Sequence, residues 1–134
     1  MLTLMTKILI ATVASFIFGF IWYSPGVFGK KWMKLSGIKQ ANSKKAKKGM
    51  GGKMVASLIG TFVTTFIISI FVTALKIGSV SLAIKFGFIA WLGFIGSTVQ
   101  LGDILWNEKP IGLFLLNGVF WFLNLSIITL ILII

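Results

Sequence analysis

The chain has 134 residues, of which 57% are hydrophobic, and it carries a formal net charge of +11. Soluble globular domains contain about 45–50% apolar residues, so this composition predicts an integral membrane protein. The sequence has no Cys and no His, which excludes disulfides, thiolate or imidazole catalysis and the usual transition-metal ligand sets. We therefore expect no metal site, no cofactor and no catalytic residue.

Only two acidic residues are present, Asp103 and Glu108. They lie five residues apart in a predicted short loop rather than on one helical face, whereas general acid–base chemistry needs a positioned titratable group. We expect that the protein is not an enzyme. A lipid-modifying enzyme that uses one of these carboxylates as its base is the least favoured alternative.

Four runs of mainly apolar residues are long enough to cross a bilayer, whose hydrocarbon layer of roughly 30 Å requires about 20 helical residues. They lie at residues 8–23, 54–75, 82–101 and 111–134. The links at 76–81 and 102–110 are short, so the helices that they join should be antiparallel neighbours. The sequence predicts an all-α integral membrane fold in a single domain over residues 1–134. It has four transmembrane helices and a short interfacial amphipathic helix between the first two.

The first run ends at Trp22 and Tyr23 without a small-x-small cleavage motif before them, so we expect a retained membrane helix rather than a secretory signal. Its small residues Ala11, Ser15 and Gly19 recur at every fourth position. This spacing predicts a face that packs closely against another helix.

Nine of the thirteen lysines lie between residues 25 and 53. Within this stretch Phe28, Trp32 and Leu35 fall on one helical face, and Lys30 and Lys34 fall on the opposite one. The pattern predicts an interfacial helix over residues 27–37, with its apolar face in the headgroup boundary and its lysines on anionic lipid headgroups. The expected membrane-interface anchor comprises Trp22, Tyr23, Phe28, Lys30 and Trp32.

Residues 40–52 have almost nothing to bury and predict a flexible basic linker. This linker is either a docking arm for a partner or a solvated topology signal. Loops rich in lysine remain cytoplasmic, and ten lysines on this side face three on the other, which are Lys7, Lys76 and Lys85. We therefore expect a cytoplasmic basic loop, with both termini outward.

The second run carries two ridges at four-residue spacing. A small-residue ridge of the kind that lets helices pack closely consists of Gly52, Ala56, Gly60 and Thr64. A hydroxyl ridge beside it consists of Ser57, Thr61, Thr65, Ser69 and Thr73. These hydroxyls either line a polar path or bond to carbonyls four residues earlier and simply pack.

The last two runs contain amides, which need partners because an unpaired polar group in hydrocarbon costs several kcal/mol. Asn117 and Asn124 lie nearly on one face, and Asn117 should be level with Ser97 and close to Gln100 of the antiparallel third helix. Either interhelical bonds or contacts to a substrate or ion would satisfy them. The candidate residues for a polar path or interhelical contacts are Thr61, Thr65, Ser97, Gln100, Asn117 and Asn124. Two mid-membrane tryptophans, Trp91 and Trp121, should pack in the core.

A charge cluster of Asp103, Glu108 and Lys109 is predicted on the side of the basic loop. Asp103 follows the third run, where a carboxylate opposes the negative end of the helix dipole. Either Lys109 or a lysine of the basic loop compensates it, or the carboxylate is a solvated surface charge.

Several segments together carry a family resemblance. They are Trp22-Tyr23-Ser24-Pro25, Phe28-Gly29-Lys30 with Trp32, Trp91-Leu92-Gly93-Phe94, Glu108-Lys109-Pro110 and Leu116-Asn117-Gly118. In this order and spacing, over nearly the whole chain, they resemble the small bacterial membrane-protein family called domain of unknown function 1761. The chain differs by having Trp106-Asn107 before Glu108 and by its extended Lys/Gly linker, and either change affects a partner surface. The resemblance implies a four-helix protein of the bacterial cytoplasmic (inner) membrane without an assigned activity.

The function that these patterns favour is a non-enzymatic helical bundle that acts through association with protein or anionic lipid, including association with copies of itself as a homo-oligomer. The alternative is a small facilitative transporter or channel with a polar intramembrane path. Proton-coupled export is disfavoured because no acidic residue occurs in the apolar runs. Nucleic acid is not an expected partner, since the basic residues include no arginine and are not interleaved with stacking aromatics.

Overall fold

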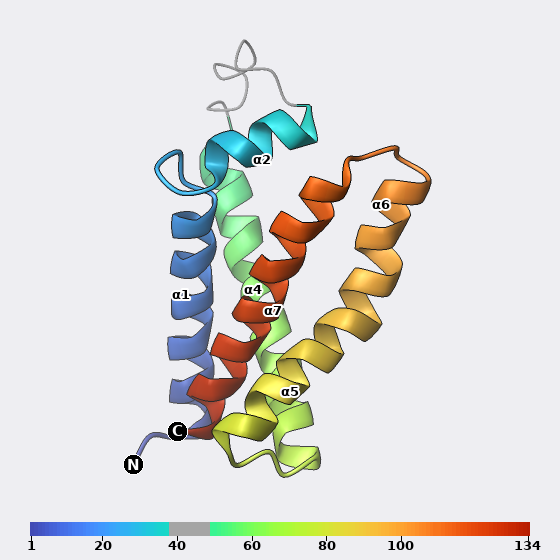
Figure 1. Cartoon of the computed structure of the whole chain (residues 1–134). Helices are drawn as coiled ribbons and strands as arrows, with labels where there is room; N and C mark the ends of the chain where they lie inside the picture. The colour runs from blue at the N-terminus through green and yellow to red at the C-terminus, as the bar shows by residue number, and fades with distance from the viewer. Residues whose placement is uncertain (38–48) are drawn as a thin grey trace.

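The computed structural model describes residues 1–37 and 49–134, and these residues form an all-α bundle (Figure 1). Four helical segments are long and apolar enough to span a membrane. They are α1 (Leu4–Trp22), α4 (Met50–Ala74), the consecutive helices α5 (Val80–Ala90), η2 (Trp91–Gln100) and α6 (Leu101–Leu105), and α7 (Ile111–Ile133). A short helix, α2 (Gly29–Ser36), lies across one end of the bundle. The predicted all-α membrane fold is confirmed.

Two spans begin earlier than the apolar runs suggested. Helix α1 starts at Leu4 rather than near residue 8, because the Thr3 hydroxyl caps it by accepting from the backbone N–H of Thr6 at 3.2 Å. Helix α4 starts at Met50 rather than at residue 54, after Gly49 in a left-handed conformation. Residues 50–52 therefore belong to a helix and not to the predicted linker at 40–52. Most of the rest of that linker lies outside the described residues.

The third span is not a uniform α-helix. Its middle part, η2, is a π-helix, in which each N–H bonds to the carbonyl five residues earlier. The wider turns bring Gln100 over Trp91, and the Trp91 indole N–H donates to Gln100 Oε1 at 2.7 Å. The Trp91 ring also lies where side chains at Gly96 and Gly118 would otherwise be. The absence of side chains at these two glycines makes room for the indole between η2 and α7.

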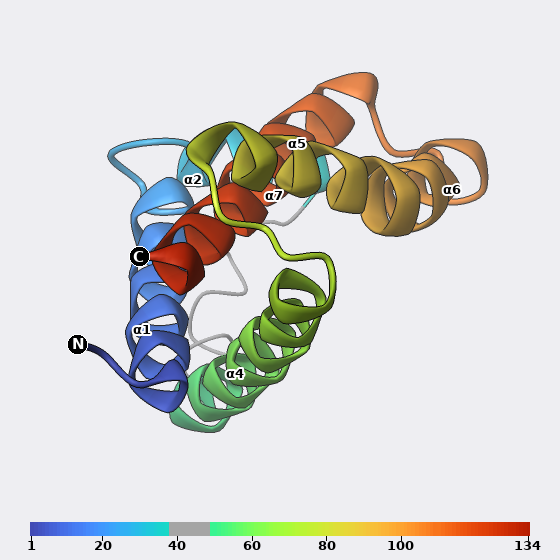
Figure 2. The ribbon, with the colours of Figure 1, turned by 90° about the horizontal axis from the view of Figure 1, so that it is seen from below.

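Helix α7 is the central element of the bundle. Half of its most apolar stretch is buried (50%), against 17–22% in the other three spans. It contacts α1, α4, α5, η2, α6 and α2, and Figure 2 shows it between α1 on one side and α5 on the other. Apart from the direct contact between α1 and α4, the other spans meet chiefly through α7, so its residues position most of the polar groups of the bundle.

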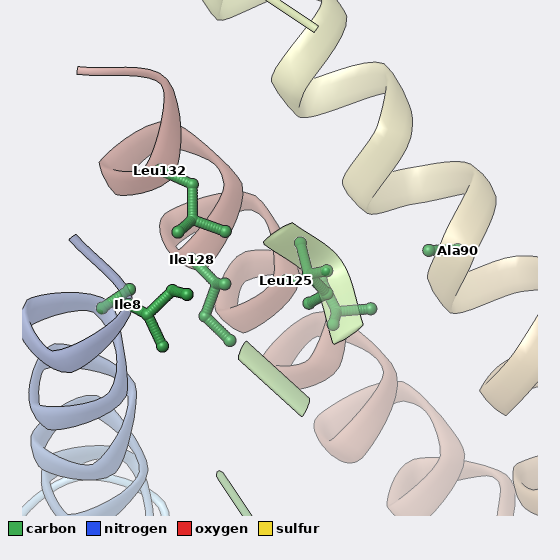
Figure 3. Close-up of a cluster of buried hydrophobic side chains, with 7 residues drawn as sticks. Ile8, Ala90, Leu125, Ile128 and Leu132 are labelled. Carbon is green, nitrogen blue, oxygen red and sulfur yellow. The ribbon is translucent and has the colours of Figure 1, made fainter. Parts of the chain in front are cut away.

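The hydrophobic core lies toward the end of the bundle opposite α2. Its buried members are Ile8, Ala11, Ile68, Ala90, Leu125, Ile128 and Leu132. Ile8 of α1 faces Ile128 of α7 in Figure 3, and both are almost fully buried. The end that carries α2, the start of α4 and the α6–α7 connection is here called the basic end. The basic end is packed less completely than the opposite end, which contains the hydrophobic core.

Candidate functional site

Two asparagines of α7 form the polar centre of the bundle. Asn124 Oδ1 accepts a hydrogen bond from the Ser15 hydroxyl at 2.7 Å, and Asn117 Oδ1 accepts one from the Tyr23 hydroxyl, also at 2.7 Å. Both donors belong to α1 or to the residue that follows it. Interhelical amide bonds therefore exist, but they join α7 to α1. Asn117 bonds to neither Ser97 nor Gln100 of the third span, although the Gln100 oxygen does lie close to the neighbouring Gly118.

The Tyr23 phenol is a neutral donor in this arrangement. Tyr23 lies one residue beyond the end of the α1 span, and burial raises its pKa to about 12. The hydroxyl thus keeps its proton at any physiological pH. Its bond fixes the side-chain amide of Asn117 with the oxygen toward Tyr23 and the nitrogen away from it.

A cavity of about 580 Å³ lies between α1, α4 and α7 toward the basic end. Its apolar wall includes Phe16, Phe20, Met54, Phe120 and Trp121, and its polar lining includes Ser15, Ser57, Thr61 and Asn124. Lys53 stands at its outer part. Trp121, predicted to pack in the core, instead borders this cavity, because α4 diverges from α7 toward the basic end and leaves the indole half-buried.

A second cavity of about 500 Å³ adjoins the first, since both are lined by Tyr23, Pro25 and Trp121. It lies under α2, and its lining adds Lys30, Trp32 and Asn117. The two asparagines therefore border adjoining cavities at different depths, and the two cavities together are here called the hollow. With Lys30 and Lys53 at its outer part, the hollow has hydrogen-bond donors inside and positive charge at the mouth.

The hydroxyl ridge of α4 behaves mainly as a packing feature. Thr61, Thr65 and Thr73 each donate to the carbonyl four residues earlier, at 2.8–2.9 Å. Thr65 is fully buried, whereas Thr61 lines the first cavity. Ser69 and Thr73 line a separate cavity of about 410 Å³ at the other end of α4, so buried Thr65 divides the ridge into two cavity-lining parts.

The small-residue ridge of α4 does not pack inside the bundle. Gly52, Ala56 and Gly60 are exposed, and a Cβ at Gly52 or Gly60 would meet no atom within 4 Å. By contrast, the corresponding ridge of α1 is used, since Ala11 and Ser15 are buried and Gly19 faces Phe120 of α7. The same spacing thus marks a packed face on α1 and an unpacked face on α4, where Gly60 borders a cavity that Trp121 and Asn124 also line.

The polar residues of the third span stay on their own segment. Ser97 is exposed and donates to the Gly93 carbonyl at 3.2 Å. Gln100 is buried, with its oxygen bound by Trp91, and its Nε2 has no partner among the described residues. Neither side chain lines the hollow between α1, α4 and α7.

Helix α2 is attached to the basic end by its apolar face. Trp32 packs edge-on against Tyr23, with ring centroids 5.8 Å apart, and Leu35 covers Gly112 of α7. Phe28 packs against Trp22, with centroids 4.4 Å apart. The predicted anchor residues therefore meet in one aromatic cluster. Trp22 contributes as a partly buried member of it, with a buried indole N–H that lacks a partner among the described residues.

The predicted charge cluster is divided between two contacts. The carboxylate of Asp103 accepts from the side-chain amide of Asn107 at 2.8 Å. The Lys109 ammonium donates to the Ser36 carbonyl at the end of α2, at 2.9 Å, and Glu108 is exposed. Lys109 therefore holds α2 rather than compensating Asp103, and the compensation comes from an amide that the charge pattern did not indicate.

Comparison with known proteins gives a family model described as "Protein of unknown function (DUF1761)", which matches residues 6–133. The chain belongs to this family. The resemblance predicted from the sequence is confirmed. No curated protein matches the chain, and no solved structure matches it either.

Ser15 and Lys53 are two of the lining residues of this DUF1761 chain that were not predicted as site residues. Ser15 was assigned only to helix packing, although a hydroxyl among apolar residues in a membrane helix needs a partner and thereby signals a polar contact. Lys53 was assigned to the basic loop, but it lies in the first turn of α4 and lines the first cavity. Lys53 belongs to the basic loop if α4 begins at residue 54 and to the helix if α4 begins at Met50, so its role depends on the position of the helix start.

Proposed function

We propose that this member of the family is a non-enzymatic membrane bundle whose basic end associates with anionic lipid. The observation that carries the proposal is the placement of α2. Its apolar face is attached to the bundle, its C-terminal carbonyl is bound by Lys109, and Lys30, Lys31 and Lys34 are exposed. Lysines held near an acidic leaflet gain about 1 kcal/mol each.

The wider setting of this proposal is a cytoplasmic basic end in the inner membrane of a bacterium, with both termini outward. The lysine asymmetry supports that orientation. A non-enzymatic role is supported by the composition, which includes only two acidic residues and neither His nor Cys.

The test compares the thermal stability of the purified protein in detergent with added phosphatidylglycerol or phosphatidylcholine. We expect phosphatidylglycerol to raise the melting temperature, and the triple variant Lys30→Gln, Lys31→Gln, Lys34→Gln to lose most of that increase. The matched control changes Lys7, Lys76 and Lys85 to Gln, which removes the same charge from the rest of the molecule. Equal losses in both triple variants would contradict a specific role for the basic end.

Association with a second copy is a further part of the proposal, supported by the exposed ridge of Gly52, Ala56 and Gly60 on α4. Small residues of this kind allow close helix contact in membranes. The substitution Gly60→Leu should then shift the mass in detergent from oligomer to monomer. A wild-type mass equal to one chain would remove this part of the proposal.

The alternative function, facilitated passage of a solute, is favoured by one observation: the hollow reaches from Lys53 to Asn124 on α7. A liposome flux assay tests it, since Asn124→Leu would place an apolar side chain at the floor of the hollow and should reduce transport. Flux that is unchanged by this substitution would rule out a path through Asn124.

A further inference from the structure

The amide nitrogen of Asn117 is an unused donor. The Tyr23 hydroxyl binds Asn117 Oδ1, so Nδ2 points away from that bond, and no acceptor for it is found within residues 1–37 and 49–134. Asn117 lines the second cavity beside Lys30. Because Asn117 is only partly buried, these N–H groups are accessible to an acceptor that enters the second cavity.

The charge around the hollow has one sign. Lys30 lines the second cavity and Lys53 lines the first. Among the residues that the structure describes, no acidic side chain lines either cavity. The mouth therefore favours a group that is anionic and rich in acceptor oxygens, such as a phosphate.

The first cavity continues from this mouth as an apolar cleft. Phe20, one of its lining residues, is 63% exposed, so the cleft opens sideways on the flank of α1 as well as toward the basic end. A molecule already dissolved in the bilayer has direct access through that flank. At the floor, Asn124 is only 4% exposed and its oxygen is bound by Ser15, which leaves little polar surface there.

The order of chemical groups along the hollow is charge, hydrogen-bond donor, then apolar wall. Lys30 lies on α2 at the end of the bundle, and Asn117 lies six residues into α7, which is about 9 Å along the helix axis. Phe120 and Trp121, three and four residues further along α7, line the cleft beyond. A glycerophospholipid carries its phosphate, ester carbonyls and acyl chains in the same order, so one molecule can satisfy all three parts.

We propose that the hollow binds one anionic glycerophospholipid, with its phosphate at Lys30, an ester carbonyl at Asn117 Nδ2 and part of one acyl chain in the apolar cleft. The remainder of that chain leaves beside Phe20. This site goes beyond association of the basic surface with lipid, because it is saturable at one molecule per chain and depends on residues that line the hollow.

Native mass spectrometry of the detergent-solubilised protein tests the site, with dioleoyl phosphatidylglycerol and its ether-linked analogue as probes. We expect one retained molecule per chain. Lys30→Gln should weaken binding about fivefold, as estimated for one lysine near an anionic headgroup. Lys34→Gln, an equal change of charge on the same helix but away from the hollow, should leave the affinity unchanged.

The ether-linked analogue lacks the ester carbonyl and isolates the Asn117 contact. Wild-type protein should prefer the ester-linked lipid about fivefold, the range expected for one hydrogen bond. Asn117→Leu should abolish this preference. The preference is the ratio of the affinities of one variant for the two lipids, so a general loss of stability, which would weaken both affinities, would not produce the same result. Equal affinities of wild-type protein for the two lipids would overturn the proposal.

Equal losses in Lys30→Gln and Lys34→Gln would also overturn the site while leaving surface association intact. The two proposals therefore fail separately. Surface association fails if the two lysine triples in the melting experiment behave alike, and the site in the hollow fails if either the Lys30 or the Asn117 comparison shows no difference.

Discussion

Gly87 of α5 lies directly against Ser126 of α7, so that a Cβ at position 87 would be 3.0 Å from the Ser126 backbone nitrogen and would also meet its hydroxyl oxygen. Backbone atoms cannot move aside as a flexible side chain can. The two helices therefore approach each other as closely as they do because position 87 has no side chain.

The first prediction follows from this contact. Gly87→Leu should destabilise the bundle by about 1–3 kcal/mol or more, since overpacking forces the backbones of α5 and α7 apart. Gly93→Leu is the control in the same span, because a Cβ there would meet no atom within 4 Å. Unfolding in mixed micelles measures both, and equal stabilities of the two variants would refute the predicted difference.

The second prediction concerns the hydrogen bond between Tyr23 and Asn117. A double-mutant cycle with Tyr23→Phe and Asn117→Leu should give a coupling free energy of about 1 kcal/mol, the range measured for interhelical hydrogen bonds in membranes. Denaturation of all four proteins under one set of conditions provides the cycle. Strictly additive losses would show that the two side chains do not stabilise each other.

The third prediction concerns the turn between α1 and α2. A Cβ at Gly29 would collide with the Tyr23 carbonyl oxygen and would lie 2.7 Å from the Ser24 carbonyl carbon. Gly29→Ala should therefore open the turn and detach α2, which faster hydrogen exchange over residues 29–36 would report. Gly26→Ala, in the same turn but with open space around it, should leave the exchange unchanged.

The fourth prediction concerns the attachment of α2 to the α6–α7 connection. Lys109→Met retains the apolar stem but removes the ammonium that binds the Ser36 carbonyl. We expect faster exchange in the last turn of α2 and a small loss of global stability. Lys31→Met is the control, since Lys31 is exposed on the same end of the bundle. Similar exchange in both variants would contradict a specific role for Lys109.

The sequence predicts the number of spans and the presence of α2 correctly because apolar length and lysine placement are local properties of the chain. It predicts partners less well. Asn117 needs a hydrogen-bond partner from another helix. Its depth along the predicted helix places it level with Ser97, but depth alone does not determine which helix it faces. The Tyr23 hydroxyl reaches Asn117 from the end of α1, and only the arrangement of helices around α7 makes that contact available.

The two ridges of small residues also show that a local pattern does not identify the packing partner. Ala11, Ser15 and Gly19 have the spacing of Gly52, Ala56 and Gly60, yet only the first set packs directly against other helices. Spacing indicates that a face is smooth enough for close contact, but it carries no information on whether a neighbour is present. The π-helix η2 also escapes prediction. Its Trp91 ring lies against Gly96 of the same segment and Gly118 of α7, and the second of these contacts is distant in the chain.

The central place of α7 has a consequence for the biogenesis of the protein. Helix α7 is the last of the four spans to be synthesised, so α1, α4 and α5 enter the bilayer before the helix on which they pack. Until then the Ser15 and Tyr23 hydroxyls lack their asparagine partners. The bundle thus forms by insertion of a late helix among earlier ones, and folding must wait for the end of translation of that span.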